Sequence, residues 1–386
     1  MEEKVIVIGG NHHNTLGLIR SLGKKGIKTV LILCSKKNDS YVLKSRYILD
    51  HYLVHNYQDS IAILTDELVC DEKQVVICAT DGAASVIDQH RDELKSHYVL
   101  PGIQQQGGLN KIMDKEAMSQ IAQSCGLRIP YSIVVRKTET DFSNIPFPCI
   151  IKPIKSIEGS KADISVCYDA EVFRKKLRNC HSKSVQVQQY ISKVFEYQLI
   201  GLSFGEVIIP GRSRIITQPL ATNTGYLHYE HLDGTEPLEQ CKEFMLKTGY
   251  SGLFSMEFIR DAEGNDYFME TNFRNDGNSI CVTEAGVNLP YIWYSLCKNP
   301  NLSLESFETE IKEIYVMPEF DEIRLWSANK ISFSRLWKEM KQANAFMEYD
   351  PEDPAPTNGK IEFWKRLLIT AFIKRPGRTI LGRNKD

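Results

Sequence analysis

The chain has 386 residues, of which 42% are apolar and 25% are charged, and its formal net charge is −2. This length predicts two or three domains of an ordinary soluble protein, and the near-zero charge excludes nucleic acid as the main partner. The ten cysteines show no C-x-x-C spacing. They indicate reduced thiols in a cytoplasmic protein and exclude a disulfide framework or a zinc site. We expect neither a signal peptide nor a membrane-spanning segment, because no apolar run has the necessary length or flanks.

The first residues of the chain predict a β-α-β unit. Two apolar runs, residues 4–10 and 29–34, are typical of buried parallel strands, and the first ends in paired glycines. We expect a helix between them, capped by Asn14 or Thr15. Ligands of such units lie at the carboxyl ends of the strands, so these two residues are candidate substrate contacts. The glycines lack the G-x-G-x-x-G spacing, which disfavours a dinucleotide site.

Asp81 follows a further predicted strand, residues 74–79. It is either a substrate contact at the carboxyl end of that strand or the N-cap of a helix over residues 83–90. A short strand at residues 98–101 then completes a small parallel sheet.

Lys152 is a single cation within an apolar strand, residues 147–153. A buried lysine needs an anionic partner, and a phosphate group would serve. Alternatively, Pro148 and Pro153 mark an edge strand on which Lys152 faces water. Around this strand we expect helices at residues 110–126, 170–180 and 238–248, and strands at residues 129–135, 164–168, 185–191, 197–201, 205–209 and 214–219.

A hairpin is predicted from residues 254–260 and 267–273, around the turn Glu263-Gly264-Asn265. Folding about the midpoint between Glu263 and Gly264 brings Glu257 directly opposite Glu270. Strand side chains alternate between two faces. The apolar face carries Phe254, Met256, Phe258, Met269 and Phe273, and the polar face carries Ser255, Glu257, Glu270, Asn272 and Arg274.

On the polar face the Cβ atoms of the two glutamates would lie roughly 5 Å apart, which is destabilising for like charges. Carboxylate and amide oxygens suit a hard cation such as Mg²⁺ better than zinc, and the forked guanidinium of Arg274 suits phosphate oxygens. The pattern therefore predicts a site for a metal ion and a phosphate. The alternative is a solvated hairpin face that bears a few charges.

Beyond residue 299 we expect helices at residues 333–345 and 361–373, separated by an acidic, proline-rich linker at residues 350–356. The second helix is apolar and runs into a basic tail. It either contacts an anionic membrane surface peripherally or packs on its own domain.

In this order, the motifs resemble those of the ATP-grasp superfamily, specifically its carboxylate–amine ligase branch of D-aspartate-ligase-like and carbamoyl-phosphate-synthase-like proteins. The resemblance covers residues 5–300. It rests on Asp114-Lys115, Phe147-Pro-x-x-x-Lys152-Pro, Gln188-Gln-Tyr-Ile191, and Glu257 with Glu270-x-Asn272-x-Arg274.

The resemblance implies an α/β (α+β) fold with three parts. These are an N-terminal β/α domain (residues 1–105), an ATP-grasp domain (residues 106–300) with a lid at about 130–190, and a mostly helical C-terminal extension (residues 301–386).

It also implies roles for individual residues. ATP would be bound by Lys115, Lys152, Lys155, Ser160, Gln188, Gln189, Tyr190, Ile191 and Glu196. Two Mg²⁺ ions, which Mn²⁺ could replace, would be held by Glu257, Glu270 and Asn272. Lys152 and Arg274 would be catalytic, and substrates would lie near Asn14, Thr15, Asp81 and Arg274, with Asn223, Tyr226 and His228 as further lining. Gln189 stands where the family often has a glutamate, and the loop at residues 155–161 contains a single glycine.

The implied reaction uses ATP to activate a small-molecule carboxylate as an acyl phosphate, which an amine then attacks to give an amide, ADP and phosphate. Precursors of the cell envelope or of polysaccharides are candidate substrates, and a homodimer is plausible. The alternatives are phosphoryl transfer of the kinase or carbamoyl-phosphate-synthase type, a catalytically silent nucleotide-binding module and, least favoured, a Rossmann dehydrogenase.

Overall fold

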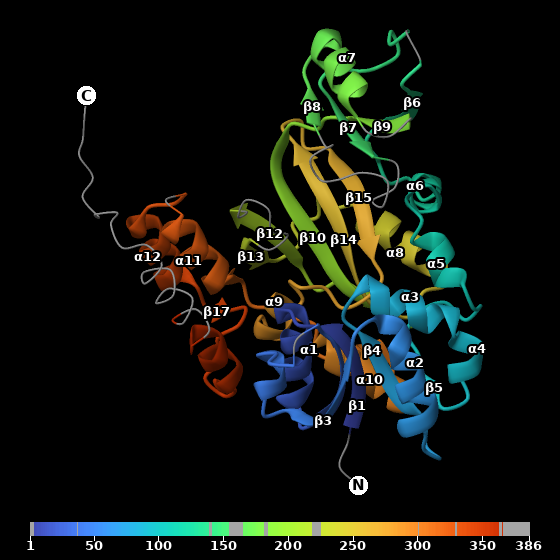
Figure 1. The fold of residues 1–386 in the computed structure, drawn as a ribbon, viewed down its shortest axis with the longest axis vertical. Coiled ribbons are helices and arrows are strands. Elements are labelled where there is room, and N and C mark those ends of the chain that lie inside the picture. Colours follow the sequence, from blue (N-terminus) through green and yellow to red (C-terminus); the bar gives the residue numbers. More distant parts are fainter. Residues whose placement is uncertain are drawn as a thin grey trace.

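The described residues form three β-sheets that follow one another along the long axis of the molecule, with the four-stranded sheet at one end and the N-terminal sheet at the other (Figure 1). The computed structural model describes residues 4–36, 38–138, 141–153, 165–180, 184–217, 225–299, 301–328, 330–362 and 365.

The N-terminal sheet is parallel and has the strand order β3-β2-β1-β4-β5. Its strands are β1 (Lys4–Gly10), β2 (Lys28–Cys34), β3 (Ile48–Val54), β4 (Gln74–Cys78) and β5 (Tyr98–Val99). The expected parallel sheet is therefore present. β3 was not expected, because this edge strand is half exposed and its sequence lacks an apolar run. The order reverses between β1 and β4, and ligands of such sheets lie beside the carboxyl ends of the strands at this point.

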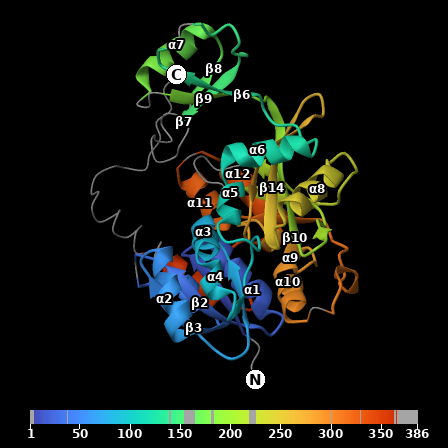
Figure 2. The ribbon, with the colours of Figure 1, turned by 90° about the vertical axis from the view of Figure 1, so that its right-hand side faces the viewer.

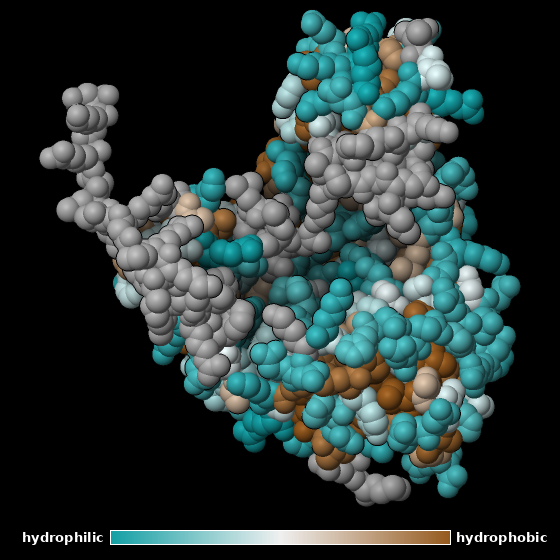
Figure 3. All heavy atoms as spheres, in the orientation of Figure 1, coloured by the Kyte–Doolittle hydropathy of each residue, from teal (hydrophilic) through white to brown (hydrophobic). Residues whose placement is uncertain are grey.

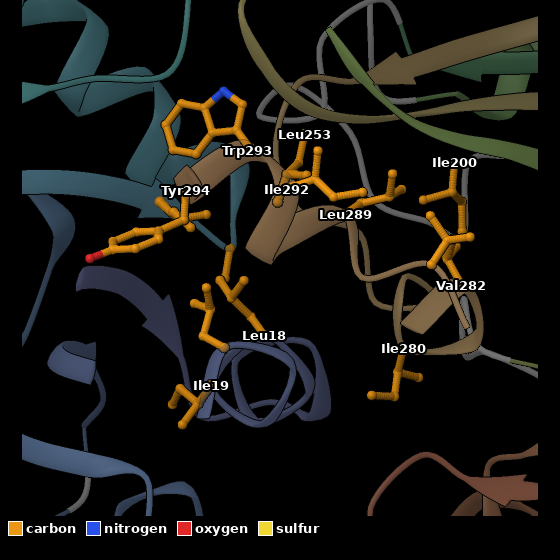
Figure 4. Packing of buried hydrophobic residues seen from close by; sticks show 14 of the residues in the cluster. Leu18, Ile19, Ile200, Leu253, Ile280, Val282, Leu289, Ile292, Trp293 and Tyr294 are labelled. Atoms are coloured by element: carbon orange, nitrogen blue, oxygen red, sulfur yellow. The ribbon is translucent and has the colours of Figure 1, made fainter. Parts of the chain in front are cut away.

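Helices cover both faces of this sheet. They are α1 (His13–Gly23), α2 (Ser60–Ala62), α3 (Asp81–Gln89), α4 (Arg91–Leu94) and α10 (Leu289–Lys298), with short 3-10 turns η1 (Val42–Lys44) and η2 (Tyr57–Asp59) and a π-helical turn η3 (Ile63–Glu67). Leu18 and Ile19 of α1 lie close to Ile292 and Tyr294 of α10, in one buried cluster (Figure 4). This cluster fixes α1, and with it the loop that follows β1.

The caps of two helices differ from the sequence expectation. His12, rather than Asn14 or Thr15, caps α1, and its Nδ1 accepts a hydrogen bond from the backbone N–H of Asn14. Thr80 caps α3 by accepting from the N–H of Ala83. The carboxylate of Asp81 is thereby free for contacts outside its own helix.

The second sheet has the strand order β6-β9-β7-β8 and is antiparallel. Its strands are β6 (Ser132–Arg136), β7 (Cys149–Pro153), β8 (Ser165–Cys167) and β9 (Ser184–Gln189). Helix α7 (Ala170–Asn179) packs Phe173 and Leu177 against this sheet, which gives it a hydrophobic core separate from the rest of the molecule. The four-stranded sheet and α7 together project away from the N-terminal sheet (Figure 2).

The third sheet has eight strands in the order β15-β14-β10-β12-β13-β16-β17, with β11 beside β10. They are β10 (Lys193–Ser203), β11 (Val207–Ile208), β12 (Arg212–Thr217), β13 (Tyr226–Glu230), β14 (Gly252–Asp261), β15 (Asp266–Asn272), β16 (Ile314–Met317) and β17 (Ala345–Phe346). Helix α6 (Lys115–Ser124) lies against β15 and α8 (Leu238–Thr248) against β11, while α5 (Gly108–Ile112) contacts α3 and α6. The aromatic rings of Phe244, Phe258 and Phe268 form the core under β14 and β15.

The hairpin of β14 and β15 has the expected register at its functional end, where Glu257 pairs with Glu270. Beyond this pair the register shifts, since Phe258 pairs with Phe268. Met269 is therefore the extra residue of a β-bulge. The prediction that Met269 lies in the core was wrong, because the bulge leaves it 36% exposed.

The C-terminal part contains α9 (Ile280–Glu284), η5 (Leu304–Ser306), α11 (Glu319–Ser327) and α12 (Phe333–Gln342), and residues 355–362 are helical. Most of the expected helix at 333–345 is present as α12, α11 was not expected, and most of the expected helix at 361–373 lies outside the described residues. Arg20 of α1 holds this part through Asp353 (3.0 Å) and the carbonyl of Glu348 (2.7 Å). Across the described ranges, every helix is too short or too polar to cross a membrane.

Candidate active site

A cavity of about 1050 Å³ lies between the four-stranded and the eight-stranded sheets, where the surface is hollowed (Figure 3). Its volume suits a nucleotide-sized ligand. Both sheets and the start of α6 contribute side chains to its wall. Eight of the residues predicted from sequence line it, namely Asp81, Lys115, Lys152, Gln188, Glu196, Glu257, Glu270 and Asn272.

Two carboxylates lie on the β14–β15 side of the cavity. Glu257 and Glu270 are register partners, and burial, then the charges of Glu270 and Asp276, raise the pKa of Glu257 to about 7. Hydrogen bonds from Gln198 and Asn272, both 3.1 Å, oppose this shift. A buried carboxylate beside other carboxylates is stabilised by a cation, so the pair has the chemistry of a metal site.

The candidate metal ligands are two carboxylates and the amide of Asn272. Within the described ranges, no group of three His, Cys, Asp or Glu side chains forms a metal site. An oxygen-only set with few protein ligands fits Mg²⁺, which usually keeps waters and shares phosphate oxygens. The donor chemistry therefore fits a magnesium–nucleotide complex better than a site built by protein ligands alone.

Two lysines lie in the same cavity. Lys152 of β7 donates to Oε1 of Gln188 (2.9 Å), and burial, then the charge of Lys115, lowers the pKa of Lys152 to about 8. Glu270 acts in the opposite direction, which indicates that the lysines and the carboxylates interact across the cavity. A pair of like-charged lysines is stabilised by an anion between them.

Arg274, just beyond β15, is held by three side chains. Its Nε donates to Asp81 (3.1 Å), its Nη1 to Asp276 (2.9 Å) and its Nη2 to Oδ1 of Asn272 (3.0 Å). Although burial alone would lower the pKa of Arg274, the carboxylates of Asp276 and Asp81 raise it. The guanidinium is therefore a fixed cation between the cavity and the switch point of the N-terminal sheet.

No protein-family model matches the chain. The D-aspartate ligase of Enterococcus faecium (strain Aus0004) is 21% identical over 329 residues, 75% of each chain. The solved structure of N5-carboxyaminoimidazole ribonucleotide synthetase in its ADP complex superimposes with a TM-score of 0.63 at 16% identity, covering 85% of each chain. The chain has the ATP-grasp fold.

Two further solved structures share this ATP-grasp fold. The L-amino acid ligase of Bacillus licheniformis gives a TM-score of 0.62 at 16% identity and covers 81% of this chain and 78% of its own. The biotin carboxylase domain of the Hydrogenobacter thermophilus 2-oxoglutarate carboxylase, in complex with MgADP and bicarbonate, gives 0.59 at 15% identity and covers 80% and 73%. At these identities the likeness shows the fold alone.

Several residues assigned by the ATP-grasp resemblance lie elsewhere. Gln189 bonds with the backbone of Tyr131 through its N–H (2.8 Å) and its Oε1 (3.3 Å), Tyr190 donates to the carbonyl of Pro148, and Ile191 is buried. None of the three is part of the cavity wall formed by the described residues. Their predicted contact with adenine stays a prediction, and Lys155 and Ser160 lie outside the described residues. Glu196 lines the cavity and pairs with Lys193.

The expected substrate contacts of Asn14 and Thr15 do not fit their positions. Asn14 is buried, and its amide bonds with the carbonyls of Ala79 (2.7 Å) and Asn275 (2.9 Å) and with the side chain of Asn275. Thr15 is fully buried against Gly9. Asn14 joins the first strands to the loop after β15, and Thr15 packs on the end of β1, which leaves Asp81 as the substrate candidate that lines the cavity.

Tyr226 and His228 do not line the cavity either. Both are buried on β13, and His228 stacks on Tyr315 at 4.3 Å. The register pairs His228 with Arg214, whereas the neighbouring Ile215 lines the cavity, so His228 lies on the other face of the sheet. Asn223 lies outside the described residues.

A second layer of polar residues behind the ATP-grasp carboxylates was missed. Gln198 donates to Glu257 and accepts from Asn278 (2.7 Å), and Ser255 donates to Asp276 (3.1 Å). The one local sequence feature that could have indicated this layer is Asp276, an acidic residue two positions after Arg274. Gln198 lies 59 residues before Glu257 in the chain, and its contact required the sheet order.

Proposed function

We propose that this chain is a magnesium-dependent ATP-grasp ligase that joins a carboxylate to an amine. One observation carries the proposal. A pair of carboxylates, Glu257 and Glu270, and a pair of lysines, Lys115 and Lys152, line the same cavity. Each pair is unfavourable alone, and a metal–polyphosphate complex presents cations to the first and anions to the second.

The names of two relatives support the choice of reaction. One is a D-aspartate ligase and the other an L-amino acid ligase. Both names describe joining an amino acid through a new bond. The neighbour with bound MgADP has the same fold.

The residues have distinct tasks in the proposed reaction. Lys115 and Lys152 hold the phosphate chain, Glu196 faces the ribose, and Glu257, Glu270 and Asn272 hold Mg²⁺, with Mn²⁺ as a substitute. When bound, Mg²⁺ neutralises phosphate charge and orients the transferred group. Arg274, fixed by Asp81, Asp276 and Asn272 beside the cavity, supplies positive charge near the transferred phosphoryl group.

A carboxylate oxygen of the first substrate attacks the γ-phosphorus, and the bond from this phosphorus to the β–γ bridging oxygen breaks to release ADP. The nitrogen of the neutral amine attacks the carbonyl carbon of the acyl phosphate. The C–O bond to phosphate breaks, phosphate leaves and the nitrogen loses a proton. Lys152 and Arg274 stabilise the negative charge that develops.

The test is a screen of carboxylate–amine pairs for Mg²⁺-dependent release of ADP, with mass analysis of the product. A carboxylate labelled with heavy oxygen should transfer one labelled oxygen to the released phosphate, since that oxygen leaves with phosphorus. A stable phosphorylated product would replace the proposal with kinase-like transfer. Absence of turnover with ATP bound would indicate a silent nucleotide-binding module.

A further inference from the structure

Helices α11 and α12 present a set of exposed aromatic and basic side chains, which we call the basic–aromatic face. Phe333 is 59% exposed, Trp337 49%, Trp326 42% and Ile323 40%. The rings are contiguous, since the centroids of Trp326 and Phe333 lie 5.8 Å apart and those of Phe333 and Trp337 6.2 Å. The other tryptophan that the structure describes, Trp293, is buried.

The core contacts of these two helices are made by their opposite side. Leu325 and Leu336 are buried, and Leu336 packs with Tyr226 and Met317. The exposed rings are therefore not needed to attach the helices to the sheet. Contiguous exposed aromatic groups of this kind mark an interaction surface.

Most exposed charges of the two helices are basic. Lys338 and Lys341 of α12 and Lys330 between the helices are exposed, and Nζ of Lys341 lies 5.2 Å from the ring centroid of Trp337. Of the four acidic residues in α11 and α12, Glu319, Glu322 and Glu339 are buried, and Asp321 forms an ion pair with Arg324 (3.3 Å). The partner of this face should therefore be anionic and also accept aromatic rings.

We propose that the basic–aromatic face docks on the surface of an anionic lipid bilayer. Tryptophan and phenylalanine rings insert at the boundary between headgroups and acyl chains, while lysines bind the anionic headgroups. This placement differs from the sequence expectation, in which the C-terminal basic segment either contacts a membrane or packs on its own domain. It is independent of the proposed ligase function.

Charge disfavours two other occupants of the face. Residues 365–386 of the chain contain seven Lys or Arg and a single acidic residue. This segment and a second copy of the same face are both positively charged, so each would add repulsion. An anionic bilayer would instead attract the positively charged face.

The experiment is flotation of the full-length protein with vesicles of phosphatidylcholine, with or without phosphatidylglycerol. Wild type should bind the anionic vesicles, and salt should weaken the binding. The triple variant Trp326→Ser, Phe333→Ser and Trp337→Ser should lose at least about tenfold in affinity, because the apolar insertion is removed. Lys338→Glu with Lys341→Glu should lose about 25-fold or more, since each lysine near an anionic surface contributes roughly fivefold.

A matched control lies on α8, where Lys242 and the 52% exposed Leu246 form a similar exposed pair. Lys242→Glu with Leu246→Ser should leave vesicle binding unchanged. The midpoint of thermal unfolding should match wild type in all variants, which excludes loss through misfolding. Unaltered vesicle binding by the triple variant would overturn the proposal. The proposal would also be overturned if wild type bound no vesicles and the triple variant instead converted a dimer to a monomer or lost binding to an oligonucleotide.

Discussion

The two faces of the eight-stranded sheet carry charges in opposite arrangements. On the face away from the cavity, Arg260 donates two hydrogen bonds to Asp266 (2.7 and 2.6 Å), and Arg212 donates one to Glu230 (2.7 Å). On the cavity face, Glu257 lies opposite Glu270 across the same hairpin. The first face pairs opposite charges, and the second brings like charges together.

The pKa shifts follow this difference. Burial alone would raise the pKa of Glu230, but hydrogen bonds from Arg212 and Arg214 lower it. The pKa of Glu257 instead rises to about 7, through burial and the charges of Glu270 and Asp276. Charges that are satisfied within the protein stabilise the fold, whereas charges that are not satisfied indicate where a ligand completes the site.

The largest expected effect comes from Glu270→Gln. Removing this charge should lower Mg²⁺-dependent ATP turnover about a thousandfold, roughly 4 kcal/mol of transition-state stabilisation. Stability in urea should not fall, because one member of an unfavourable pair is removed. Steady-state kinetics and urea unfolding on the same preparation measure both, and normal turnover would show that the metal site lies elsewhere.

The matched control is Asp266→Asn, on the opposite face of the same hairpin. Its ion pair with Arg260 is nearly buried, so its loss should cost about 3 kcal/mol of unfolding free energy. The turnover of the folded variant should stay near that of wild type. If both variants lost turnover alike, the two faces of the sheet would not differ in function.

Glu257→Gln tests the same contrast through pH. Because its pKa is about 7, the folded protein keeps this proton to higher pH than the unfolded chain. The resulting stability is complete below the ordinary glutamate pKa and is lost as the pH rises through about 7. Gln imitates the protonated form, so without metal the variant should equal wild type near pH 4 and exceed it by roughly 3 kcal/mol at pH 8.

Urea titrations at the two pH values measure this difference. Other buried acids, such as Glu319 and Glu322, cancel because both proteins contain them. Adding Mg²⁺ with ATP should stabilise wild type and not the variant. A constant difference at all pH values would contradict the raised pKa.

Lys152→Met tests the cationic side of the cavity. Loss of a charged hydrogen-bond donor should weaken MgATP binding by about 2 kcal/mol, roughly thirtyfold. With a pKa near 8, Lys152 loses its charge as the pH rises past this value, so wild-type affinity should fall there and that of the variant should not. Calorimetry measures both, with Lys242→Met as the control, since Lys242 pairs with Glu239 on the exposed side of α8. An unchanged affinity would remove Lys152 from the phosphate site.

Local sequence patterns were sufficient for part of this architecture. Alternation along two strands and a turn signal gave the Glu257–Glu270 register, and apolar runs with glycines gave the parallel sheet. These features depend on residues a few positions apart. The expected cap of α1 was two or three residues too late, and Asp81, whose role as a cap was one of two alternatives, follows the actual cap of α3 by one residue, because several neighbouring polar residues can serve as a cap.

The rest depends on contacts between distant parts of the chain. Asn14 bonds with Asn275, and Arg20 bonds with Asp353, 333 residues away. No local pattern distinguishes an asparagine that joins two segments from one that faces a substrate. The basic–aromatic face was likewise hidden, because α11 has too little periodicity to be separated from a loop before its packing on the sheet is known.

The smallest expected effect is on the free energy of unfolding, and it concerns Met269. This residue is the β-bulge, at which the alternation between the two faces of β15 is interrupted. Met256 is fully buried on β14, so Met256→Ala should cost about 2–5 kcal/mol of unfolding free energy. Met269→Ala should cost less than about 1 kcal/mol, because the bulge turns this side chain into the cavity wall. Urea unfolding of the two variants compares them directly. Equal costs would mean that Met269 is as buried as Met256 and that the hairpin closes without a bulge. The position of the Glu257–Glu270 pair relative to the buried aromatic rings would then differ from the one described.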